Sequence, residues 1–265
     1  MWNTNEGASK EYWTQRAIDQ VYADYGDRIS ITDKNKSLLK FGRNQLVQTT
    51  KSTLMTLPSG QSNETYITTN GITTVSSTST VDAQPITVEG HTVDGSGNFT
   101  FATQSLTLTG QTQATLTTSL ARVTRAYNTG SLDLSGTIYF YRPGGSSAGV
   151  PTTDVNVHMM IAPGLNNTEK ASTTLSNDDY WVITNFYADC LEKTATFGIV
   201  HLEIRLKGGV FRNKLDRSCN DTNHVFHQLK PFIIVPPNSD VRLRVSASAS
   251  NKDFSGGISG FLLKA

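Results

Sequence analysis

The chain has 265 residues, with 23 Lys or Arg against 22 Asp or Glu, so its formal net charge is +1. This balance gives no overall field toward nucleic acid or an anionic membrane surface, and no stretch approaches the roughly 20 apolar residues of a membrane span. Residues 1–13 lack the basic and apolar regions of a secretory signal, so we expect synthesis in a cytoplasm.

An amphipathic helix is predicted for residues 9–25, followed by Gly26 as a stop signal. One side of this segment carries aromatic and small apolar side chains, and the stripe is too short to be stable alone. It therefore needs a partner surface, which is either the chain's own β domain or a neighbouring subunit, and the sequence leaves both open. The predicted assembly contacts are Trp13, Ala17, Val21, Tyr22 and Tyr25.

Residues 46–98 are poor in bulky apolar side chains, most clearly from Thr73 to Gln84. A segment of this composition cannot hold a core by itself. We interpret it as extended arms or edge strands that become ordered by pairing, for example with another copy. The turn signal at Asp94–Gly97 lies near its end.

The rest of the chain alternates between apolar and polar residues with the period of a strand, giving about ten short strands in all. The alternating stretches are 106–109, 114–123, 138–141, 155–159, 182–186, 202–206, 241–249 and 258–262. Because no predicted helix lies between these strands to serve as a crossover, a parallel α/β fold is excluded. The predicted fold is all-β, an antiparallel β-sandwich or jelly-roll-like fold with a short N-terminal helix and an extended arm.

The predicted organisation has three parts. Residues 1–45 form the N-terminal helix and arm, residues 46–98 form the extended β or arm region, and residues 99–265 form the jelly-roll-like sandwich. The cysteines, Cys190 and Cys219, are expected to be reduced thiols packed as small apolar groups.

A search for chemistry finds no nucleotide-binding loop, serine-nucleophile elbow or zinc-protease motif. His224 and His227 are three residues apart and would face opposite sides of a strand, so they chelate a metal poorly. The basic run 205–217 is interrupted by Asp216 and indicates a solvated face or subunit salt bridges more than a nucleic-acid surface. We expect no enzyme activity, no cofactor, no metal site and no nucleic-acid or membrane partner.

The C-terminal half carries a characteristic set of strand and turn motifs. They are Lys207–Arg212, Pro231–Pro237, Ser239–Arg244, Ser246–Asn251 and Phe254–Gly260, with Leu106–Gln111 and Leu120–Val123 upstream. Over roughly residues 85–265 the chain resembles a family of uncharacterised virion structural proteins of tailed bacteriophages from marine and aquatic bacteria. These motifs describe a scaffold and identify no active site.

The resemblance implies a virion component made in the cytoplasm of a bacterial host. The leading hypothesis is a capsid decoration or cement protein, a homo-oligomer such as a trimer, whose partners are the major capsid protein or other virion proteins. The alternative is a tail, collar or fibre-adaptor protein, or a receptor- or carbohydrate-binding β-sandwich. For that alternative Trp181, Tyr187 and Tyr141 are candidates to stack on sugars, although the apolar neighbours of Trp181 favour a core position.

Overall fold

The computed structural model describes residues 36–192, 196–220 and 224–264. The described residues form antiparallel strands joined by turns, with one short 3-10 helix, η2 (Asp154–Asn156), and no α-helix among them. The predicted all-β, antiparallel fold is confirmed. The predicted helix 9–25 lies outside the described residues.

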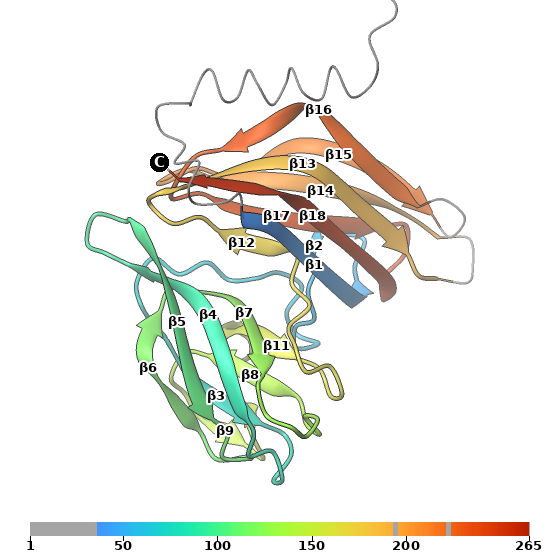
Figure 1. The fold of residues 1–265 in the computed structure, drawn as a ribbon. Helices are drawn as coiled ribbons and strands as arrows, with labels where there is room; N and C mark the ends of the chain where they lie inside the picture. The colour runs from blue at the N-terminus through green and yellow to red at the C-terminus, as the bar shows by residue number, and fades with distance from the viewer. Residues whose placement is uncertain (1–35, 193–195, 221–223, 265) are drawn as a thin grey trace, which may run out of the picture.

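One sandwich, here called the large sandwich, pairs two sheets around a single core (Figure 1). The strands of its first sheet, in spatial order, are β1 (Lys36–Val47), β18 (Lys252–Lys264), β13 (Asp179–Cys190) and β16 (Val225–Val235). The strands of its second sheet are β12 (Ser172–Thr174), β17 (Asp240–Ala247), β14 (Phe197–Arg205) and β15 (Arg212–Asn220), with β2 (Ser52–Thr53) pairing to β17.

The other sandwich, here called the inserted sandwich, is formed by the chain between β2 and β12. Its first sheet consists of β11 (Val157–Ile161), β8 (Ile138–Tyr141), β3 (Ile72–Ser77) and β6 (Ala114–Leu120). Its second sheet consists of β5 (Phe99–Thr107), β4 (Pro85–Val93) and β7 (Arg122–Asn128), and a short hairpin adds β9 (Ser146–Ser147) and β10 (Val150–Pro151).

The period-two pattern explains both cores, because successive side chains of a strand point to opposite faces. In the large sandwich the inward positions include Trp181, Phe186 and Phe254, all fully buried. The inserted sandwich has its own core, which includes Ile72 and Phe140. The molecule therefore contains two hydrophobic cores. Figure 1 shows that the two sandwiches lie next to each other.

The chain divides differently from the predicted parts 1–45, 46–98 and 99–265. Most of 46–98 belongs to the inserted sandwich, where β3 and β4 pair with strands of the same chain. The physical reason is that Thr and Ser alternate there with a few β-branched residues, such as Val75 and Val88, that are fully buried. This segment therefore shares a core with residues 99–161 and does not form a free arm.

Candidate assembly surface and the polar seam

The outer face of the sheet β1-β18-β13-β16 carries a row of aromatic residues from three of its four strands, with a glycine on β18 between them. The strand register aligns Phe41 with Gly257, Gly257 with Tyr187, and Tyr187 with Phe226. The rings of Phe41 and Tyr187 stack with their centroids 6.4 Å apart. A Cβ atom at Gly257 would lie 2.5 Å from the Tyr187 hydroxyl, so the glycine allows the two rings to meet across β18.

Strand β1 forms one edge of this sheet, and β18 is its only strand partner within the described residues. Its outward side chains Leu39 and Leu46 are 61% and 43% exposed. At the opposite edge, Phe226 of β16 is 72% exposed. A long edge strand with exposed apolar side chains is a template for pairing with another chain. We call β1 and this outer face the assembly surface.

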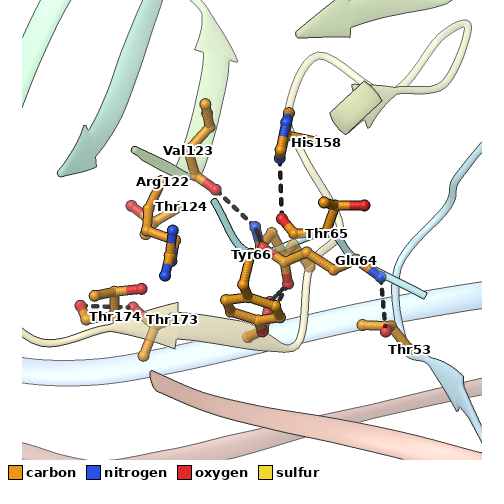
Figure 2. A network of polar contacts seen from close by, with 12 residues as sticks. Thr53, Glu64, Thr65, Tyr66, Arg122, Val123, Thr124, His158, Thr173 and Thr174 are labelled. Carbon is orange, nitrogen blue, oxygen red and sulfur yellow. Dashed lines mark hydrogen bonds and ion pairs between the residues drawn. The ribbon is translucent and has the colours of Figure 1, made fainter. Parts of the chain in front are cut away.

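A second feature, the polar seam, lies where the two sandwiches meet and is built around Glu64 (Figure 2). The Glu64 carboxylate forms a buried ion pair with Lys170 and accepts hydrogen bonds from Ser172 (2.7 Å) and Tyr66 (2.9 Å). Lys170 also donates to the backbone carbonyl of Val123 at the end of the inserted sandwich (2.7 Å). Burial alone would raise the pKa of Glu64, but Lys170 and these hydrogen bonds outweigh it and lower that pKa.

Asp240 of β17 forms the next part of the seam. Its Oδ1 accepts hydrogen bonds from Arg122 Nε of the inserted sandwich (3.0 Å) and Thr174 Oγ1 (2.6 Å). Its Oδ2 accepts hydrogen bonds from Arg205 Nε and Nη2 at 2.9 and 2.5 Å. Burial opposes ionisation of Asp240, yet the two guanidinium groups dominate and lower its pKa. One carboxylate therefore joins the two sandwiches through Arg122.

Glu203 of β14 anchors the third part of the seam, with Lys51, Arg242 and Arg244 around its carboxylate. Against the effect of burial, these three cations lower the pKa of Glu203 to about 2. The Arg242 guanidinium also lies 3.6 Å from the centroid of the Phe211 ring. This cation–π contact adds to the Glu203 ion pair in holding the Arg242 guanidinium in place.

The seam holds more positive than negative charge. Its described ion pairs use six cationic side chains against three carboxylates. Lys40, buried beside it, donates to the backbone carbonyl of Thr124 (3.3 Å). Burial, followed by the charge of Lys170, lowers the pKa of Lys40 to about 8.

A cavity of about 350 Å³ opens beside the seam, between the two sandwiches. Arg122, Arg205 and Lys207 contribute charged groups to its lining, and Phe99 and Leu206 contribute apolar ones. Three turn glycines, Gly97, Gly208 and Gly209, also line it. Such a volume lies at the lower end of the ~300–1,000 Å³ typical of small-molecule sites.

Three strands of the large sandwich bring Ser246, His201 and Asp216 together. His201 Nδ1 lies 2.5 Å from Asp216 Oδ1, and its Nε2 lies 3.2 Å from Ser246 Oγ. The order Ser, His, Asp matches the catalytic triad of a serine hydrolase. However, Ser246 sits inside β17, with its backbone in register with Ile199 of β14, and not on an exposed turn. The arrangement serves as a polar bridge across three strands.

The structure places the residues singled out from the sequence as follows. The five predicted assembly contacts, Trp13, Ala17, Val21, Tyr22 and Tyr25, lie outside the described residues. Trp181 and Tyr141 are fully buried and unable to stack on a sugar, whereas Tyr187 reaches the outer face.

The two histidines of the weak metal motif have separate partners. His224 pairs with Asp189 (2.6 Å) and His227 lies 3.0 Å from Arg217. Within the described ranges, no group of three or more His, Cys, Asp or Glu side chains is placed to hold a metal ion. Both cysteines are buried thiols that form no disulfide, as expected.

Sequence reasoning missed the polar seam. Its arginines on β17 alternate with buried valine and leucine, a pattern typical of a half-buried strand with one wet face. The only signal of the seam in the sequence was the high density of charged residues in 203–217 and 240–244. This density does not indicate that a second sandwich covers part of the charged strand face.

The described part of the chain contains no helix with the length and apolarity that a bilayer span requires. No family model and no curated protein sequence matches the chain. Among solved structures, the T13 particle of infectious bursal disease virus is similar at 9% identity and a TM-score of 0.24, covering 94% of this chain and 77% of that chain. The Gx strain of the same virus gives 10% identity and a TM-score of 0.24, covering 89% and 75%. At these TM-scores the similarity supports no conclusion about the function of the chain.

Proposed function

We propose that the chain is a structural subunit of a virus particle, specifically a capsid decoration protein that binds other subunits through its sheet edge. The observation that carries this proposal is the exposed apolar edge of β1. The expected partner at β1 is a second copy of the chain, because backbone pairing between two edge strands needs no further sequence match.

Two other features of the molecule support this role. The seam ties the sandwiches together through buried ion pairs, so a contact made by the large sandwich also positions the inserted one. The outer face adds the aromatic row next to β1, which extends the apolar area available to a neighbouring subunit. The resemblance to tailed-phage virion proteins points to the same class of function.

The test compares two paired substitutions that place lysines on exposed apolar positions. Leu39→Lys with Leu46→Lys puts charge on the β1 edge, a known means of blocking strand pairing. Val81→Lys with Leu132→Lys is the matched control, because both residues are 68% exposed and lie outside named strands of the inserted sandwich. We expect the unmodified chain and the control to form the same oligomer by light scattering, and the edge variant to be monomeric.

Particle binding provides the second measurement. Particles lacking the protein should take up the unmodified chain and the control in co-sedimentation, and should take up less of the edge variant. An unmodified chain that stays monomeric and does not co-sediment with particles would contradict the proposal. Equal particle binding by all three proteins would show that β1 is not the contact.

A further inference from the structure

The lining of the cavity beside the seam has more cationic than anionic side chains. Arg122 and Arg205 share the single carboxylate of Asp240. Lys207, which also lines the cavity, has a hydrogen bond to the neutral amide oxygen of Asn98 (2.6 Å). Outside the lining, the charge of Lys207 contributes to the lowered pKa of the exposed Asp94, after the hydrogen bonds from Asn98 and Ser96. Three cations therefore face the cavity with one carboxylate among its lining residues.

The surroundings increase this imbalance. The neighbouring part of the seam also has more cations than carboxylates, since Glu203 is shared by Lys51, Arg242 and Arg244. Holding excess positive charge in a partly buried place is costly unless an anion compensates it. Arg205 binds Asp240 through Nε and Nη2, which leaves the Nη1 donors of its guanidinium for a ligand carboxylate.

The rest of the cavity lining suits an organic ligand better than a bare inorganic ion. Phe99, Leu206, Ile67 and Val93 place apolar surface around the charged wall. Ser96 also lines the cavity, and because it is exposed it lies at the opening to solvent. Small-molecule sites typically combine such apolar walls with a few polar groups that fix the orientation of the ligand.

We infer that this cavity binds a small organic acid of about monosaccharide size, with its carboxylate at Arg205 and Lys207 and its ring against Phe99 and Leu206. The inference is independent of the particle role, because the site lies at the junction of the two sandwiches and not on the β1 edge. It assigns the protein a ligand-binding function in addition to its structural one.

The experiment is calorimetric titration of the full chain with D-glucuronate and with N-acetylneuraminate, using D-glucose as the neutral match of the first. We expect saturable binding of at least one acid and about tenfold weaker binding of glucose, the equivalent of one charge-assisted contact. Lys207→Met should weaken binding of the acid about fivefold or more. Lys214→Met, an exposed lysine of β15 away from the cavity, is the control and should leave it unchanged.

A second variant tests the place of binding without changing charge. Ser96→Trp adds a bulky side chain at the mouth of the cavity and should abolish binding while the circular dichroism of the chain stays the same. No saturable binding of either acid up to roughly 10 mM would overturn the inference. Equal loss in Lys207→Met and Lys214→Met, or inorganic phosphate binding as tightly as the acids, would overturn it as well.

Discussion

Two histidines of the inserted sandwich are buried in surroundings that disfavour their charged form. His91 lies edge-on to the rings of Phe99 and Phe101, and burial together with the charge of Lys40 lowers its pKa to about 3. His158 is held by the backbone carbonyl of Thr65 (3.0 Å), and burial lowers its pKa to about 4. Both are therefore neutral in the folded protein at pH 7.

This burial predicts a loss of stability in mild acid. Below the unfolded-state pKa of about 6.5 the unfolded chain binds protons that folded His91 and His158 do not, so stability falls with pH until the folded pKa values are reached. The limiting slope for each histidine is about 1.4 kcal/mol per pH unit. We expect urea unfolding to show a marked decrease in stability between pH 6.5 and 5.

Substitution of the two histidines tests the assignment. His91→Gln with His158→Gln should flatten this part of the pH profile, even if stability at pH 7 is lower. His224→Gln is the control, because the side chain of His224 is 81% exposed. The carboxylates Glu64 and Asp240 have lowered pKa values and lose their contribution only at lower pH. A slope unchanged by the double substitution would contradict the assignment.

At the scale of elements, the loops that link the two sandwiches contribute several of the charged side chains of the polar seam. Glu64 lies between β2 and β3, and Lys170 lies just before β12. Both side chains are 3% exposed. Lys170→Met should cost about 3–5 kcal/mol, because it leaves the Glu64 carboxylate buried without its cation. Adding Glu64→Gln should recover part of that loss, and urea unfolding of the four proteins gives the coupling energy.

An exposed ion pair provides the comparison for this cycle. Lys264 bonds to Asp178 (3.0 Å), with both side chains at least 40% exposed. Breaking that pair by Asp178→Asn, which leaves Lys264 its second partner Asp179 (2.8 Å), should cost less than about 1 kcal/mol. Additive effects of Lys170→Met and Glu64→Gln would mean that the two side chains do not stabilise each other.

Strand positions followed from the sequence where alternation was strong. β8 occupies the predicted residues 138–141, and the predicted turn at 94–97 joins β4 to β5. The alternation of Leu202, Ile204 and Leu206 predicts that the strand includes Leu206, but β14 ends at Arg205 and Leu206 is 50% exposed. A turn that includes Gly208 at φ +69° follows at once, and local turn geometry prevailed over the apolar pattern there.

The division into two sandwiches could not be predicted from alternation. An alternation with a period of two residues shows which side chains lie on the same face of a strand. It does not show which strands pair within one sheet. β1 pairs with β18, at the other end of the described chain. The polar seam could not be predicted either, because the alternation does not show which distant residues meet. Arg122 and Asp240 are 118 positions apart, and each has a sequence context typical of an exposed strand face.

At the scale of the whole molecule, the arrangement has two cores and one charged junction. The large sandwich uses chain from both sides of the insertion, residues 36–54 and 171–264, so its core forms only when distant segments meet. The inserted sandwich is continuous from β3 to β11. Each core is able to lose its structure separately unless the junction couples them. The coupling must come from contacts that cross the seam, of which Arg122 to Asp240 is a buried one.

This predicts that the full chain unfolds in a single calorimetric transition and that Asp240→Asn separates it into two. The substitution leaves Arg122 and Arg205 with no carboxylate at this point of the seam. It therefore removes a buried ionic link between the sandwiches but neither core. Asp253→Asn is the control, since Asp253 pairs with Arg43 inside the large sandwich; it should lower the transition temperature without dividing the transition. A single transition in Asp240→Asn would show that other contacts suffice to couple the two cores.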